Sequence, residues 1–251
     1  MRAIILGCGA SAGVPRIDGN WGDCDPSEPK NRRSRGSIVV EQGDTRLLVD
    51  TSPDLRNQFL ANNLTSVSGV AWTHDHADQT HGLDDLRMLA YASGTRVAGY
   101  ADDFTMQRLK AKFGYCFDGV SPGYPPIIEG RLIDGPFTVG DIHVQPFRQD
   151  HGKIHSLGFR FGDLAYSNDV VALDDAAFEM LAGVKVWVVD ALRYTPHPTH
   201  AHLARTLEWI ARLKPERAVL TNMHIDLDYN KLKTELPPGV EPAYDGMIIE
   251  C

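Results

Sequence analysis

The sequence predicts an α/β protein built of two β-sheets that pack face to face, with helices on the outside. Strand-like segments come first in runs and are then separated by helical segments, which is typical of that layered arrangement. The chain is 251 residues long and 43% hydrophobic, so it can bury a sizeable core. No segment has the composition of a linker, and we therefore expect one domain over residues 1–251.

In the first half of the chain, apolar runs predict strands and helical spacing predicts helices. The apolar run Ala3–Leu6 ends in the glycine-rich turn Gly7–Pro15. In Asp18–Gly36 the apolar residues follow neither the helical nor the strand periodicity, which indicates an irregular surface excursion. The other elements expected in this half are strands at Ser37–Val40, Arg46–Asp50 and Val67–Trp72, and helices at Pro53–Asn62, Leu83–Ala92 and Asp103–Phe113.

The second half begins with a loop rich in proline and glycine, Gly119–Pro126, and then repeats the same kinds of element. Strands are expected at Phe137–Phe147, Leu157–Phe161, Leu164–Ser167, Val184–Asp190, Ala218–Thr221 and Met247–Glu250, and helices at Asp174–Leu181 and Ala201–Leu213.

Composition excludes several function classes. The chain has 25 basic and 33 acidic residues, a formal charge of −8, and so lacks the basic surface that dominates nucleic-acid affinity. No apolar run approaches the roughly 18 residues of a membrane-spanning helix, and the apolar stretch at the start is too short for a signal peptide, so we expect a cytoplasmic protein. The four cysteines are widely scattered and are expected to be free thiols.

The strongest chemical signal lies where the strand ending at Trp72 gives way to a helix. His74 and His76 project to the same side of an extended segment, and Asp78 can turn in from the next bend. Two imidazoles and a carboxylate at this spacing can converge on a metal ion. The alternative is an exposed polar loop, which would not require this spacing.

Three further strand ends carry polar residues of the same kind. His151 follows one strand, Asp169 closes another after Ser167-Asn168, and Asn222 and His224 follow a third. A two-sheet protein can bring such strand ends together along one edge. We therefore expect one site assembled from separate parts of the chain.

At these motifs the sequence resembles the metallo-β-lactamase fold hydrolases, nearly from end to end, and most closely the branch that contains the phosphoribosyl cyclic phosphodiesterase. The shared segments include Gly13-Val14-Pro15, His74-Asp75-His76-Ala77-Asp78, Asp150-His151, Ser167-Asn168-Asp169, Pro198-Thr199-His200 and Leu236-Pro237-Pro238-Gly239. The resemblance implies a four-layer αβ/βα sandwich of two mixed β-sheets flanked by helices. It also implies His74, His76 and His151 on one metal ion, with Asp78 on a second and Asp169 bridging the two.

The sequence departs from this family at the second metal. Gln79 and Asn222 stand where the family has histidines, and an amide oxygen is a poorer zinc ligand than imidazole, although it can bind Mn²⁺. His81 and His224 each lie two residues further on, and are either substitute ligands or groups that orient the ligands. We therefore expect one or two divalent cations, zinc or manganese.

The remaining site residues have further expected roles, of which the resemblance implies only that of His200. His200 is the expected acid that protonates the leaving oxygen, and Asp78 is expected to orient the nucleophile as well as to bind metal. Ser167, Asn168 and the backbone amides of the glycine-rich turn are candidates for holding phosphate oxygens. A basic run at Arg32, Arg33 and Arg35 is expected to be solvated, with the contact of one arginine to a substrate phosphate as the alternative.

The leading hypothesis is a metal-dependent phosphodiesterase that acts through a metal-activated hydroxide on a small cyclic or nucleotide-like phosphodiester. A tRNA 3′-processing endonuclease is the alternative enzyme, and the charge of −8 argues against it. A non-catalytic metal- or nucleotide-binding protein is the alternative from another class, because the second metal site is altered. The sequence names neither the substrate nor the native metal, predicts no membrane association, and leaves a homodimer open.

Overall fold

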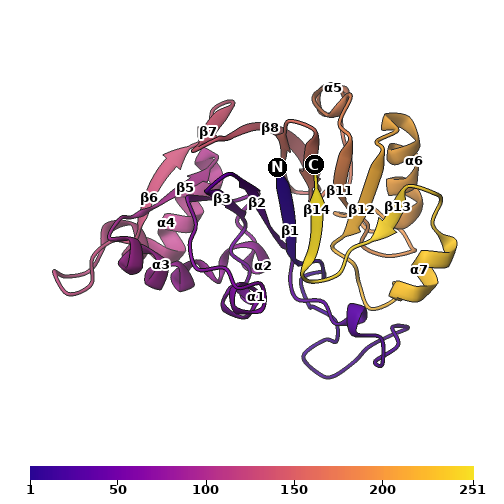
Figure 1. The fold of residues 1–251 in the computed structure, drawn as a ribbon, viewed down its shortest axis with the longest axis horizontal. Coiled ribbons are helices and arrows are strands. Elements are labelled where there is room, and N and C mark those ends of the chain that lie inside the picture. Colours follow the sequence, from indigo (N-terminus) through magenta and orange to yellow (C-terminus); the bar gives the residue numbers. More distant parts are fainter.

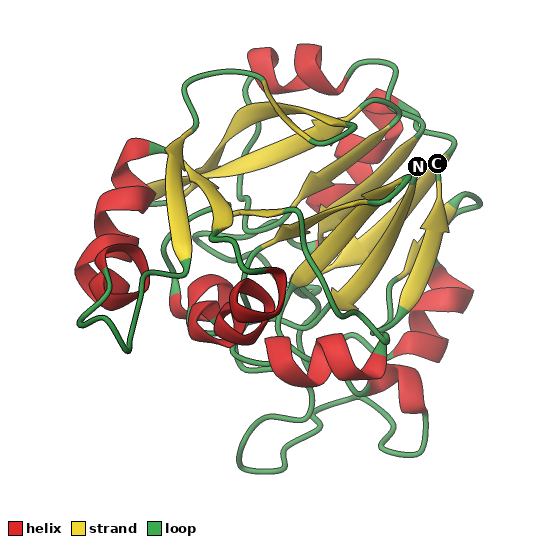
Figure 2. Ribbon diagram, turned by 60° about the vertical axis from the view of Figure 1, so that its left-hand side comes forward, coloured by secondary structure: helices red, strands yellow, loops and turns green.

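The computed structural model describes residues 1–251 as two seven-stranded β-sheets stacked face to face, with helices on both outer sides (Figures 1 and 2). The strand orders are β14-β1-β2-β3-β4-β5-β6 and β13-β12-β11-β10-β9-β8-β7. The two-sheet α/β prediction and the four-layer sandwich are therefore confirmed.

The first sheet and its helices come mainly from the first half of the chain. Its strands are β1 (Arg2–Gly7), β2 (Ser37–Gln42), β3 (Thr45–Val49), β4 (Gly69–Ala71), β5 (Val97–Ala101), β6 (Ile128–Leu132) and the C-terminal β14 (Met247–Glu250). The helices of this half are α1 (Leu55–Ala61), α2 (Ala77–Thr80), α3 (Leu86–Ser93), α4 (Asp103–Asp118) and the 3₁₀ turns η1 (Pro29–Asn31) and η2 (Leu83–Asp85).

The second sheet comes from the second half, with helices α5 to α7 beside it in Figure 1. Its strands are β7 (Phe137–Val139), β8 (Ile142–His151), β9 (Ile154–Phe161), β10 (Leu164–Ser167), β11 (Val186–Asp190), β12 (Arg217–Thr221) and β13 (Val240–Pro242). The helices are α5 (Asp175–Leu181), α6 (Leu203–Leu213) and α7 (Tyr229–Glu235).

Alternation along the strands of the first sheet divides its apolar residues between two cores. In β1, Ala3 and Ile5 belong to the large core that includes both sheets, whereas Ile4 and Leu6 belong to a second core shared with α1, α3 and α4. Successive side chains of a strand point to opposite faces, so a strand that is apolar at every position is buried on both sides.

Six elements were not expected from the sequence, namely the strands β5, β6 and β13, the helices α2 and α7, and the 3₁₀ turn η1. The expected strand Phe137–Phe147 is also wrong as a single element. It is two antiparallel strands, β7 and β8, because the chain turns at Gly140, whose φ of +52° favours glycine.

The irregular excursion Asp18–Gly36 lies against the C-terminal part of the chain. Asn31 is buried, and its amide donates to Asp228 Oδ2 at 2.6 Å while its Oδ1 accepts from Tyr229 N at 2.8 Å. The expectation of a solvated basic run is wrong for Arg33, which is only 2% exposed and donates to Asn31 Oδ1.

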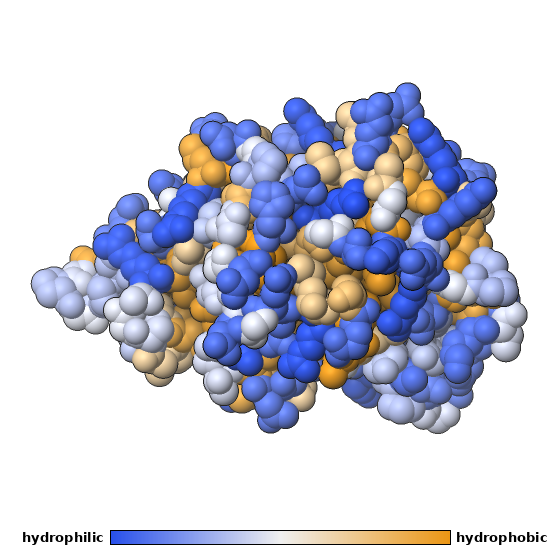
Figure 3. Space-filling view, turned by 45° about the horizontal axis from the view of Figure 1, so that its top comes forward, coloured by the Kyte–Doolittle hydropathy of each residue, from blue (hydrophilic) through white to orange (hydrophobic).

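The outer surface is mixed. Figure 3 shows hydrophilic residues over most of one face, with apolar residues in smaller areas between them. None of the helices is both long enough and apolar enough to span a membrane.

Candidate metal centre

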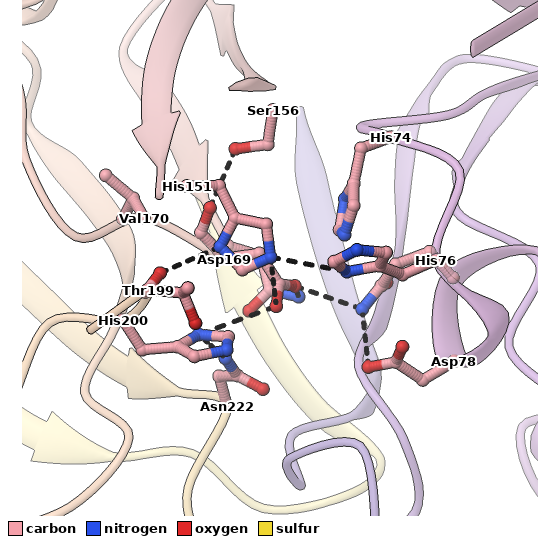
Figure 4. Close-up of polar contacts among 12 residues, drawn as sticks. His74, His76, Asp78, His151, Ser156, Asp169, Val170, Thr199, His200 and Asn222 are labelled. Carbon is pink, nitrogen blue, oxygen red and sulfur yellow. Dashed lines mark hydrogen bonds and ion pairs between the residues drawn. The ribbon is translucent and has the colours of Figure 1, made fainter. Parts of the chain in front are cut away.

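The candidate residues meet at one edge of the sandwich because the strands that carry them are parallel. β10, β11 and β12 form a parallel set, so the residues at their carboxyl ends, Asp169, Asp190 and Asn222, lie together. β3 and β4 are also parallel, and His74 follows β4 on the other side of the site. The hairpin between β8 and β9 supplies His151 (Figure 4).

Three imidazoles face one another at the centre of this edge (Figure 4). Ligand atoms of His74, His76 and His151 all lie within 4.8 Å of one another, and His76 Nδ1 is 3.3 Å from His151 Nε2. Two nitrogens bound tetrahedrally to one zinc ion at the usual bond length stand about 3.3 Å apart. His74 Nε2 is buried and has no hydrogen-bond partner. The three nitrogens therefore fit one divalent cation.

Neighbouring groups fix which nitrogen is free in two of the three imidazoles, those of His74 and His151. His151 Nδ1 donates to the carbonyl oxygen of Thr199 at 2.8 Å, which leaves Nε2 without a proton. His74 Nδ1 lies 3.0 Å from Thr73 Oγ1, whose hydroxyl donates to Asp50 Oδ2 at 2.9 Å, so that oxygen accepts from His74. These hydrogen bonds thus turn the Nε2 lone pairs of His74 and His151 toward the site, as in many metal centres.

Burial keeps two of the imidazoles neutral. It lowers the pKa of His74 well below its usual range, and neighbouring histidines lower it further. Burial and the nearby His200 lower the pKa of His151 to about 4. Both rings are therefore uncharged at pH 7, the form that binds metal.

Two carboxylates border the histidine cluster. Asp169 is fully buried, with its Oδ1 3.9 Å from His151 Nε2, and Asp78 is half-buried nearby (Figure 4). Burial raises the pKa of Asp169 well above its usual range, and Asp78 raises it further, while His200 lowers it. A cation beside Asp169 would offset this cost of burying a charge.

His200 stands on the opposite side of Asp169. Its Nδ1 lies 3.0 Å from Asp190 Oδ2 and 3.5 Å from Asp169 Oδ1. Burial alone would lower the pKa of His200, but the Asp190 carboxylate, with Asp169 and Asp78, raises it to about 9. His200 therefore carries a proton at neutral pH.

The two residues expected to contact substrate are both fully buried. The Ser167 hydroxyl accepts a hydrogen bond from Trp187 Nε1 at 3.0 Å, and Asn168 Nδ2 donates to Asp169 Oδ2 at 2.7 Å. A role in substrate binding stays a prediction for both, and it requires that they become accessible.

The amides of the glycine-rich turn bond to the protein itself. Cys8 N donates to Asp245 Oδ1, Gly9 N donates to Ser34 O, and Ala10 N donates to Met223 O. These three amides are therefore not free to hold phosphate.

The two alternative histidine ligands lie away from the cluster. His224 contacts Arg16 and Asp226, and the ring of His81 packs edge-on against Phe113. Neither ring joins the groups of potential ligands.

Sequence reasoning missed three residues that support the site, namely Asp50, Thr73 and Asp190. Asp190 is fully buried at the end of β11, where Oδ2 accepts from Val170 N and Oδ1 accepts from Asn222 Nδ2. The signal that marked Asp169, an acidic residue closing a buried strand, was also present at Asp50 and Asp190.

A family model described as the β-lactamase superfamily domain matches residues 45–225, which is most of the chain. The chain therefore belongs to the β-lactamase superfamily, and its two stacked sheets place it among the members with the metallo-β-lactamase fold.

Within that superfamily, the chain is similar to the crystal structure of a diphosphatase from the PhnP family. The sequence identity is 33%, the TM-score is 0.92, and the match covers 100% of this chain and 98% of the other. Zinc-bound PqqB from Methylobacterium extorquens has 19% identity and a TM-score of 0.76, covers all of both chains, and shows the shared fold.

The chain is also 31% identical over 253 residues to a protein named octanoyltransferase from Porphyromonas gingivalis. That alignment covers 98% of this chain and 51% of the other protein. The chain thus spans about half the length, or less, of the curated relatives it matches.

Proposed function

We propose that this protein is a metal-dependent hydrolase that cleaves a phosphorus–oxygen bond in a small cyclic or nucleotide-like phosphodiester. The observation that carries the proposal is the histidine cluster, in which three ring nitrogens face one point beside Asp169. The likeness to a diphosphatase at 33% identity over the whole chain supports phosphoryl chemistry.

His74, His76 and His151 would hold the divalent cation, with Asp169 beside them. When bound, such a cation lowers the pKa of a coordinated water to about 7 and withdraws charge from a phosphoryl oxygen. His76 is exposed, whereas His74 and His151 are buried, so the site opens to solvent on the His76 side. A substrate phosphate would approach from there.

The remaining chemistry belongs to the protein's own side chains. Asp78 lies at the open side and would orient the attacking water through its carboxylate. His200 carries a proton beside Asp169 and would give it to the leaving oxygen, while Asp190 holds the ring in place. Attack and leaving-group protonation would thus come from opposite sides of the cluster.

A small substrate suits the charge of the chain better than tRNA does. With 33 acidic against 25 basic residues, the formal charge disfavours binding of a polyanion, whereas a single phosphodiester requires only a local site. We propose zinc or manganese as the cation, because imidazole and carboxylate donors accept both.

The test is hydrolysis of bis(p-nitrophenyl) phosphate and of a 2′,3′-cyclic nucleotide by metal-stripped protein, before and after adding Zn²⁺ or Mn²⁺. We expect the added ion to restore turnover in the wild type and in His143→Ala, a matched control at an exposed position on β8. His76→Ala should abolish the restored turnover, and His200→Ala should reduce it about 10²–10⁴-fold.

Turnover that survives chelation, or that His76→Ala leaves intact, would refute the proposal. Faster cleavage of a tRNA precursor than of either small diester would favour the endonuclease instead.

A further inference from the structure

The amide of Gln79 links the two carboxylates that border the histidine cluster. Gln79 is fully buried, and its Nε2 donates hydrogen bonds to Asp78 Oδ2 at 3.1 Å and to Asp169 Oδ2 at 3.0 Å. In the family that the sequence resembles, a second cation belongs with these two carboxylates. In this chain, a neutral hydrogen-bond donor contacts both of them.

An amide nitrogen cannot replace imidazole as a ligand. The –NH₂ group offers two hydrogen atoms for donation and no free lone pair, and both carboxylates use it. A cation between Asp78 and Asp169 would require the side-chain amide of Gln79 to rotate by about 180° and present Oε1 to it. In the structure this oxygen is buried without a hydrogen-bond partner. Without the cation, that orientation would set an oxygen against two carboxylates, which is repulsive.

Asn222, the other residue that replaces a family histidine, also presents its amide nitrogen to an acidic group. It is 1% exposed, and its Nδ2 donates to Asp190 Oδ1 at 3.2 Å. Its φ of +60° lies in the left-handed region that asparagine adopts readily. Both substitutions therefore supply hydrogen-bond donors to carboxylates where the family has metal ligands.

We propose that this chain binds a single divalent cation, at His74, His76 and His151, and that the Gln79 amide takes the place of a second cation by bonding Asp78 to Asp169. The inference rests on the metal site of the proposed function but not on its substrate. A centre with one cation carries two positive charges fewer than a centre with two. It should therefore favour a monoanionic diester over a dianionic monoester.

The experiment counts bound metal without relying on activity. Metal-stripped protein is saturated with Mn²⁺, freed of excess ion, and analysed by mass spectrometry for metal per chain and by electron paramagnetic resonance. We expect one equivalent and the spectrum of an isolated ion. Gln79→His with Asn222→His should bind two equivalents and show a coupled pair, whereas Gln107→His, a control substitution at an exposed position on α4, should stay at one.

Two equivalents in the wild type would overturn the inference, and this result needs no variant to fold. A folded double variant that remains at one equivalent would also overturn it, because the two amides would then not be what excludes the second ion.

The same data separate this inference from the proposed function. One bound cation without diester hydrolysis would refute the function alone, and two cations with hydrolysis would refute the inference alone. Protein that binds no cation would refute both.

Discussion

The hydrogen-bond chain behind His74 can be tested with Thr73→Val, which removes one hydroxyl and keeps the shape of the side chain. Thr73 Oγ1 accepts from His74 Nδ1 at 3.0 Å and donates to Asp50 Oδ2 at 2.9 Å, and all three residues are buried. Valine leaves a ring N–H and a carboxyl oxygen in the interior without these partners.

The cost follows from the two lost hydrogen bonds. A buried polar group left without a partner costs about 1–3 kcal/mol, so the variant should lose about 2–4 kcal/mol of unfolding free energy. For a chain of this length, that corresponds to a fall in Tm of roughly 5–15 °C. The ring of His74 is then held less firmly, and metal affinity should fall about 10–100-fold.

The measurements are thermal unfolding of the metal-free protein and competition with a chromophoric chelator for Zn²⁺. Thr221→Val is the matched control, because Thr221 is 1% exposed and its hydroxyl has no hydrogen-bond partner. The control should keep or raise the free energy of unfolding, because it removes a buried hydroxyl that has no partner, and it should leave metal affinity unchanged. If the two variants behave alike in both measurements, the role assigned to Thr73 is wrong.

Three further predictions concern other parts of the molecule. Burial raises the pKa of Asp245 to about 6 from the ordinary value of 3.8, so its stabilising contribution is fully present below pH 3.8 and is lost as the pH rises through 6. This difference in pKa corresponds to about 3 kcal/mol of unfolding free energy. Urea unfolding between pH 4 and 7.5 should therefore show that the unfolding free energy of Asp245→Asn depends less on pH than that of the wild type. The same pH dependence in both proteins would contradict the assignment. Gly82→Ala would set a Cβ 2.0 Å from the carbonyl oxygen of Ser52 and should destabilise the fold by about 2 kcal/mol or more. The control Gly114→Ala lies in α4, where a Cβ meets nothing within 4 Å, and it should be neutral or stabilising in the same unfolding assay. His224→Ala should leave the metal content unchanged by mass spectrometry, since the ring is bonded to other side chains, and a loss of metal would instead make His224 a ligand.

The strands that the sequence predicted well are those whose signal is local. Leu164–Ser167 and Met247–Glu250 have the expected bounds, because each is an apolar or alternating run that ends abruptly. β5 was missed because its sequence, Val97–Ala101, contains alanine and glycine, which are weak strand formers. Gly99 is required there because a Cβ would lie 2.8 Å from the ring of Trp72, a contact that only the folded chain reveals.

The sequence by itself determined the kinds of chemical group available and their places at the ends of strands. Histidines at 74, 76 and 151 and an aspartate at 169 could be chosen as a candidate site because each follows or closes a short apolar segment. Only the tertiary structure decided which polar groups meet. His76 and His151 are 75 residues apart and come together through the stacking of two sheets, whereas His81, five residues from His76, packs against Phe113. The amide of Gln79 is likewise held between the carboxylates of Asp78 and Asp169, which are 91 residues apart in the chain. Contacts between such distant residues leave no local sequence pattern from which they could be predicted.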